Sequence, residues 1–190
     1  MQQAFLYINS DWKRYTALHK HVSPLLFLVI FFRNPGMFFS VIFRFERYFL
    51  YHKMIILKVL GAILYPFYFI ITYYIMDVDI PPDATIGPGL YVHNRGIIFT
   101  SSVVAGKNLT LIGPLTIGMK GMADKGVEVP KMGNDVTIFT GARIIGDVKV
   151  GNNVYIGANA VVVKDVSSNS VVGGVPAKLL KKIKPLKKNS

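Results

Sequence analysis

The chain has 190 residues and no cysteine, which excludes disulfides and thiolate metal sites. Its formal net charge is +12, from 22 Lys and Arg against 10 Asp and Glu. No nucleic-acid-binding motif accompanies this charge, so we expect no nucleic acid as a partner. An anionic membrane surface or a phosphorylated cofactor accounts for the charge better. The length allows one domain with an appendage.

Residues 1–76 are rich in aliphatic and aromatic side chains and show no repeat. They contain three apolar runs, at 24–32, 37–43 and 54–76. The first two are too short to span a bilayer at about 1.5 Å per residue. The third is long enough, although it contains Lys58 and Pro66. The sequence therefore predicts an α-helical, membrane-associating region over 1–76.

The run 54–76 has three possible settings. A spanning helix would leave basic groups on both sides of the membrane, which the positive-inside bias disfavours. An aromatic-rich helix lying in the membrane interface would keep its Lys and Arg at the level of the headgroups. The third possibility is burial against a partner subunit. We favour the interface, with the protein in the cytoplasm at the inner face of the cell membrane. No cleavable signal peptide is legible.

From Ile80 onward an aliphatic residue returns at every sixth position. The positions are Ile80, Ile86, Ile97, Val103, Leu109, Leu115, Met132, Ile138, Ile144, Val150, Ile156 and Val162. In the later hexads a small residue follows four positions on, as at Ala142 and Ala160. A period of six fits neither a helix nor an alternating strand, but it fits a three-sided solenoid. We predict a mainly β fold, a parallel β-helix of about five coils over 77–178, followed by a basic tail over 179–190.

The repeat fails at two places. Ile86 and Ile97 are eleven residues apart where two hexads need twelve, which we interpret as a coil side that is one residue short. Residues 119–128 have no hexad pattern and are rich in Gly and charge. They are predicted to form a loop outside the prism, and long loops are often functional.

His93 lies at the first irregularity and is the only histidine after residue 52. Imidazole titrates near neutral pH, so it can take the proton of a hydroxyl that attacks a thioester. This part of the chain has no cysteine and no serine with a nearby histidine, which favours direct transfer over a covalent acyl-enzyme.

Residues 78–184 resemble the left-handed β-helix, or hexapeptide-repeat, acyltransferases, in their serine O-acetyltransferase-like branch. The resemblance rests on the hexads, on Val78-Asp79-Ile80-Pro81-Pro82, on His93 followed by Gly96-Ile97, and on the closing Gly173-Gly174-Val175-Pro176-Ala177-Lys178. It implies a left-handed β-helix and a homotrimer. It also implies that acetyl-CoA, with no metal, lies in the groove between neighbouring prisms.

Matched motifs imply the roles of individual residues. His93 would be the general base, and Asp79 the carboxylate that orients it. A gap placed elsewhere in the alignment would put Asn94 at the catalytic position instead. Gly118 would present its backbone N–H to the thioester. The residues that would line the pantetheine groove or meet the coenzyme's phosphates are Thr140, Gly141, Ala142, Gly157, Ala158 and, for the phosphates, Lys178.

The chain departs from the serine acetyltransferases at the groups that hold free serine. Their second histidine and the arginine before it correspond to Val129 and Glu128, and an aspartate corresponds to Val92. We therefore expect an acetyl-CoA-dependent O-acetyltransferase that acts on a sugar hydroxyl of a cell-surface polysaccharide (capsule, exopolysaccharide or O-antigen) or its precursor. The alternatives are a serine O-acetyltransferase of cysteine biosynthesis and a non-catalytic trimeric scaffold.

Overall fold

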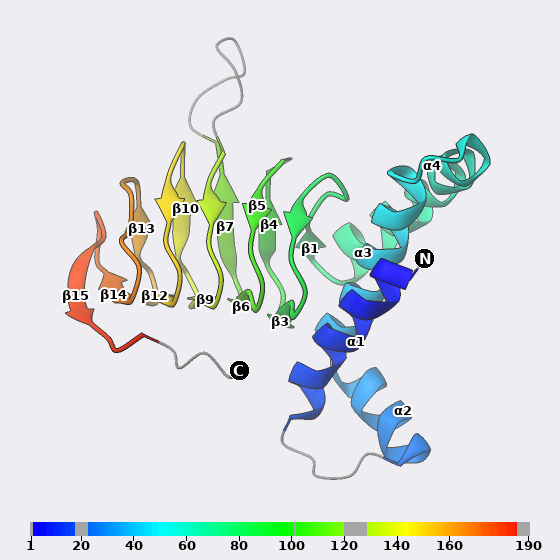
Figure 1. Cartoon of the computed structure of the whole chain (residues 1–190), viewed down its shortest axis with the longest axis horizontal. Coiled ribbons are helices and arrows are strands. Elements are labelled where there is room, and N and C mark those ends of the chain that lie inside the picture. Colours follow the sequence, from blue (N-terminus) through cyan, green and yellow to red (C-terminus); the bar gives the residue numbers. More distant parts are fainter. Residues whose placement is uncertain (1, 18–22, 101, 120–128, 186–190) are drawn as a thin grey trace.

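A computed structural model of the protein describes residues 2–17, 23–100, 102–119 and 129–185. Helices at the amino-terminal end precede a three-sided stack of short strands, and they lie at the end of the stack where β1 and β3 are found (Figure 1). All but the first residue of the loop predicted at 119–128, and the last five residues of the predicted tail, lie outside the described residues.

The helical region consists of α1 (Gln2–Thr16), α2 (Pro24–Arg33), α3 (Pro35–Leu50) and α4 (Ile55–Phe69), which η1 (Ile70–Ile75) continues as a π-helix. The Ser23 hydroxyl caps α2 by accepting the Leu26 N–H at 3.2 Å. Asn34 ends α2 because its backbone and side-chain N–H groups both donate to the Ile30 carbonyl, and Pro35 then opens α3. The predicted helical region is therefore present.

The strands form three sheets. Sheet A contains β1 (Val78–Asp79), β4 (Ile97–Phe99), β7 (Leu115–Gly118), β10 (Arg143–Ile145) and β13 (Val161–Val162); sheet B contains β2 (Thr85–Ile86), β5 (Val104–Ala105), β8 (Lys131–Met132) and β11 (Lys149–Val150); sheet C contains β3 (Tyr91–His93), β6 (Thr110–Ile112), β9 (Val136–Ile138), β12 (Val154–Ile156), β14 (Ser170–Gly173) and β15 (Lys178–Lys182). All paired strands are parallel except β14 and β15, so the first residues of the predicted tail form an antiparallel strand. Four coils have a strand on every side. A fifth consists of β13, a bridge at Val166 and β14.

The hexad positions form the core of the prism. Every aliphatic hexad residue named above is at most 4% exposed, and Ala142 and Ala160 at the second inward position are fully buried. Burial of each large aliphatic side chain contributes about 2 kcal/mol. The predicted β-helix and its inward positions are confirmed.

The prediction of a short coil side was wrong. Val78 pairs with Ile97, nineteen positions later, whereas Ile97 pairs with Leu115, eighteen positions later. The first coil is therefore one residue longer than the second. The extra residue lies in the corner 94–96, where the next coil has only Gly113-Pro114.

Aliphatic spacing could not reveal this insertion, because each side has two inward positions and both are aliphatic. Ile86 is in line with Ala105 and Met132, at the first inward position. Ile97 is in register with Leu115, and Leu115 is in register with Ala142, at the second inward position. The eleven-residue spacing joins two different positions of the hexad.

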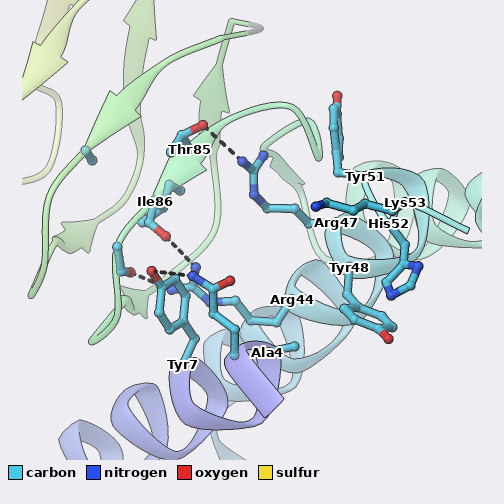
Figure 2. A pocket seen from close by; sticks show the side chains of 13 residues that line it. Ala4, Tyr7, Arg44, Arg47, Tyr48, Tyr51, His52, Lys53, Thr85 and Ile86 are labelled. Carbon is cyan, nitrogen blue, oxygen red and sulfur yellow. Dashed lines mark hydrogen bonds between the residues drawn. The ribbon is translucent and has the colours of Figure 1, made fainter. Parts of the chain in front are cut away.

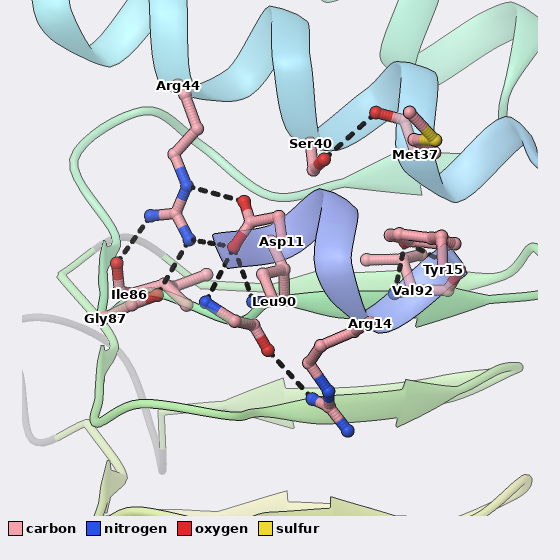
Figure 3. Close-up of polar contacts among 11 residues, drawn as sticks. Asp11, Arg14, Tyr15, Met37, Ser40, Arg44, Ile86, Gly87, Leu90 and Val92 are labelled. Carbon is pink, nitrogen blue, oxygen red and sulfur yellow. Dashed lines mark hydrogen bonds and ion pairs between the residues drawn. The ribbon is translucent and has the colours of Figure 1, made fainter. Parts of the chain in front are cut away.

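A buried ion pair attaches the helices to the first coil (Figure 3). Asp11 of α1 accepts from Arg44 of α3 at 2.9 and 3.2 Å, and also from the backbone N–H groups of Gly89 and Leu90 at 2.8 and 2.7 Å. Arg44 donates in turn to the Ile86 and Gly87 carbonyls at 2.6 and 2.7 Å. Four backbone groups of the first coil thus find partners on the helices.

Neighbouring side chains of α1 extend this attachment to β3. The Tyr15 hydroxyl accepts the Val92 N–H at 2.8 Å and donates to the Val92 carbonyl at 3.2 Å, as a neighbouring strand would. Arg14 donates to the Gly89 carbonyl and to the Thr110 hydroxyl, both at 2.8 Å. Because β3 is the last strand of sheet C, α1 covers an edge that would otherwise be open.

Replacing Asp11 with Ala should lower the free energy of unfolding by about 3–5 kcal/mol, since it leaves Arg44 buried without its counter-charge. Asp165→Ala is the matched control, because Asp165 is an exposed carboxylate that caps one backbone N–H, that of Lys149. Its loss should cost about 1 kcal/mol. Urea unfolding measures both. Equal destabilisation by the two substitutions would contradict the role given to the Asp11–Arg44 pair.

Glu46 should make the stability pH-dependent. It is buried with one carboxyl oxygen unpaired, and burial raises its pKa from 4.5 to about 7. Between those two pH values the unfolded chain has lost this proton while the folded chain keeps it, so folding stability falls as the pH rises. The melting temperature of the natural protein should therefore decline relative to Glu46→Gln from pH 4.5 to 7. A constant difference between the two proteins would contradict this.

Candidate active site

His93 ends β3 with its side chain exposed to solvent. Its ring stacks on that of Tyr91, with the centroids 6.1 Å apart and the planes 9° from parallel. The Arg14 guanidinium lies over the Tyr91 ring, 5.6 Å from its centroid. The sequence did not reveal this support, because Arg14 and Tyr91 are 77 positions apart. The imidazole is both accessible and held by a neighbour that α1 fixes.

The residues of the later coils that are in register with His93 form a row across sheet C. His93 is paired with Ile112, and the row continues through Phe139 to Gly157 in the later coils. A Cβ added to Gly157 would have only the Val172 carbonyl within 3.4 Å, at 3.2 Å. Gly157 therefore lies on the same face of the prism as His93, and a side chain there would crowd one backbone carbonyl.

The corner between sheets C and A, here called the C–A edge, consists of residues 94–96, 113–114, 140–141 and 158–159. Its coils are joined by backbone bonds from Gly141 to the Pro114 carbonyl at 2.6 Å and from Asn159 to the Thr140 carbonyl at 2.9 Å. Gly141 has φ +76°, and a Cβ there would lie 1.9 Å from the Asn159 side-chain oxygen. Thr140, Gly141 and Ala158 thus share an edge with the turn that follows His93.

Two of the predicted cofactor residues need comment. Ala142 is fully buried, its N–H donates to the Phe139 carbonyl, and its carbonyl accepts from Thr116. We correct its assignment, because Ala142 is a core residue with no free group to offer a ligand. Lys178 is exposed at the start of β15, paired with Gly173 in the last coil.

Asp79 and Gly118 lie on sheet A, not on the sheet of His93. Asp79 is half-buried and paired with Ile98, and burial raises the pKa of its carboxyl. No hydrogen bond joins Asp79 to His93 in the described part of the chain. Gly118 ends β7, and its carbonyl accepts the Gly146 N–H at 3.0 Å. Since different faces of a prism point away from one another, a ligand that touches both must cross an edge or lie between two prisms.

A pocket of about 600 Å³ lies elsewhere, between the helices and sheet B (Figure 2). Its lining includes Tyr7, Arg47, Tyr51 and Lys53, and none of the predicted site residues. No group of three or more His, Asp or Glu that could hold a metal ion occurs among the residues that the structure describes.

Residues 130–164 match the model of the bacterial transferase hexapeptide (six repeats) family. The stack of coils matches the left-handed β-helix of hexapeptide-repeat proteins. The chain is 35% identical over 112 residues to the serine acetyltransferase of Staphylococcus aureus strain Mu50, which covers 58% of this chain and 52% of that protein. It is 36% identical over 116 residues to the serine acetyltransferase of Buchnera aphidicola subsp. Schizaphis graminum, covering 60% and 44%. The chain thus spans about half the length of the curated relatives it matches.

The structural similarity also includes the helices. The crystal structure of Neisseria gonorrhoeae serine acetyltransferase superposes on this chain with a TM-score of 0.79 and 28% sequence identity, covering 98% of this chain and 69% of that one. The helical region before the β-helix is therefore shared with a serine acetyltransferase.

The expectation of a saccharide acceptor was wrong, because these relatives are serine acetyltransferases. The argument for it rested on Val129, Glu128 and Val92. Val129 and Val92 are both buried in the prism core, so neither side chain faces a ligand on the surface. Glu128 lies outside the described residues.

Gly141 and Gly157 should differ in how much their substitution by alanine destabilises the protein. Gly141→Ala should lower the free energy of unfolding by about 1–3 kcal/mol, because its backbone conformation is strained for a side chain and Asn159 occupies the space. Gly157→Ala should lower the free energy of unfolding by about 1 kcal/mol, since its Cβ would press on the Val172 carbonyl alone, at 3.2 Å, and the backbone there is not strained. Chemical denaturation measures both. Equal destabilisation by Gly157→Ala and Gly141→Ala would mean that the Val172 carbonyl cannot shift to admit the Cβ.

Proposed function

We propose that the protein is a serine O-acetyltransferase that takes its acetyl group from acetyl-CoA. The observation that carries the proposal is the similarity to the gonococcal serine acetyltransferase over 98% of this chain, helices and β-helix together. The exposed, ring-stacked His93 supports it, because this reaction needs a base that a small substrate can reach.

In the proposed mechanism His93 takes the proton of the serine hydroxyl. The oxygen attacks the carbonyl carbon of the thioester, and a backbone N–H, which the family resemblance assigns to Gly118, stabilises the negative charge on the carbonyl oxygen. The intermediate collapses to the acetyl ester and the CoA thiolate, which takes the proton back from His93. Asp79 acts as a positioning residue that orients the imidazole when the site is assembled.

The proposal includes a homotrimer, with the coenzyme between neighbouring prisms. His93 and Gly118 stand on different faces of one prism, so a groove between two prisms is the place where one ligand can meet both kinds of face. Thr140, Gly141, Gly157 and Ala158 offer small side chains or none along such a groove. Lys178, on the strand that pairs with the last coil, supplies a cation for the coenzyme's phosphates. Residues 77–178 would then form the transferase domain.

Replacing His93 with Ala should reduce acetyl transfer from acetyl-CoA to L-serine by about 10²–10⁴-fold, the usual contribution of a general base. Asn94→Gly is the matched control, since Asn94 is the adjacent exposed residue and has φ +71°, which glycine adopts freely. It should keep most of the activity. Release of CoA, followed with a thiol reagent, measures the rate, and circular dichroism checks the fold.

Three other results would change the proposed mechanism or acceptor. Activity of His93→Ala within about threefold of the natural protein, against a loss of 10² or more expected for a base, would remove His93 from the mechanism. Loss of activity in Asn94→Gly alone would move the catalytic position by one residue. A natural protein that releases CoA with another hydroxyl compound but not with L-serine would overturn the acceptor.

A further inference from the structure

The helix formed by α4 and η1, residues 55–75, is apolar and touches the rest of the protein along one narrow stripe. Gly61, Tyr68 and Thr72 are its buried residues. The remaining sides are exposed, with Ile55 at 74%, Ile56 at 67% and Phe67 at 62%. Among the described residues this is the one helix long and apolar enough to cross a membrane. In Figure 1 it lies at the end of the molecule away from β15.

The stripe ties the helix to the protein at two points. A Cβ added to Gly61 would lie 2.9 Å from the backbone nitrogen of Leu50, so α3 and α4 touch at their backbones. The Tyr68 hydroxyl donates to the Ile80 carbonyl, next to β1. A helix inserted across a bilayer would have to give up these contacts, whereas a helix lying along a membrane surface keeps them.

Charge on the helical region favours an anionic surface. The first 76 residues contain two acidic side chains, Asp11 and Glu46, and both are buried. Among the exposed basic side chains of the same region are Lys53, just before α4, and Lys58 within it. These residues therefore present cations and no carboxylate to their surroundings, and the next exposed carboxylate is that of Asp77, just beyond η1.

The pocket of Figure 2 opens beside the start of the helix. Lys53 lines it and makes none of the described hydrogen bonds or ion pairs. Arg47 lines it too, although its guanidinium is engaged with the Pro82 and Ala84 carbonyls and the Thr85 hydroxyl. Tyr48 and Tyr51 complete an aromatic, cationic wall that suits the phosphate of a lipid headgroup.

We infer that the α4–η1 helix binds in the plane of an anionic lipid surface, with its exposed aliphatic side chains among the acyl chains and Lys53 and Lys58 at the phosphates. A single protein partner would cover one side of the helix, but here the exposed side chains outside the stripe lie on several sides and, apart from Lys58, are mainly aliphatic and aromatic. Exposed tyrosines occur before, within and at the end of the helix, at Tyr51, Tyr65 and Tyr74, and tyrosine is enriched at the level of lipid headgroups. This inference does not depend on the acceptor proposed above.

Flotation of the full chain with vesicles tests it. The protein should float with vesicles of phosphatidylglycerol and phosphatidylcholine, and more weakly with phosphatidylcholine alone. Ile56→Glu/Ile63→Glu should weaken binding roughly a hundredfold. The matched control Val104→Glu/Val163→Glu adds the same charges at exposed valines of the β-helix and should bind normally. Lys53→Gln and Lys58→Gln should each weaken binding about fivefold, on anionic vesicles only.

Three results would overturn the inference. One is the absence of flotation with anionic vesicles. Another is protein that resists extraction from the vesicles at high pH, because it would indicate a spanning helix. The last is a complex between copies, in solution without lipid, that Ile56→Glu/Ile63→Glu dissociates, because the helix would then be covered by a second chain. CoA release measured on the same samples reports separately on the proposed transferase.

Discussion

The buried pair of Asp11 and Arg44 satisfies the backbone at the open end of the β-helix. The first coil of any such stack has N–H and C=O groups with no preceding coil to pair with, and such an edge invites association with other chains. Here one carboxylate accepts two backbone N–H groups, and one guanidinium donates to two carbonyls. The two charges also bind each other, so neither is left buried alone. Each later coil stacks on the coil before it, so the whole prism rests on this first coil, whose backbone groups the helices satisfy.

The candidate site depends on the same attachment. The helix that carries Asp11 also carries Arg14 and Tyr15, which hold the coil around Tyr91 and Val92 through hydrogen bonds and ring contacts. His93 follows directly and stacks on Tyr91. The proposed base is thus positioned by residues more than 70 positions earlier in the chain. The regular coils further on contribute a surface of small residues instead, such as Gly157, where an added Cβ would press on the Val172 carbonyl alone.

The hexads allowed the prism and its inward residues to be predicted from the sequence. A period of six fits a three-sided solenoid and no helix or alternating strand, and each coil places buried aliphatic residues at the same positions. The helical nature of the first 76 residues could be predicted from their three apolar runs. The inserted residue in the first coil could not, since Ile86 and Ile97 look alike while occupying different inward positions. Ala142 and Val129 were misjudged because a motif match does not tell which way a side chain points. The contacts of Asp11, Arg14 and Arg44 join distant segments, and no local pattern announces them.

The central claim is that this prism transfers an acetyl group to the hydroxyl of serine. The most direct measurement follows acetyl-CoA labelled with ¹³C in its acetyl group, mixed with L-serine and the natural protein, by NMR during the reaction. We predict that the label moves into an ester on the serine hydroxyl in step with CoA release. Label that ends only in free acetate, or that stays in acetyl-CoA, would contradict the account.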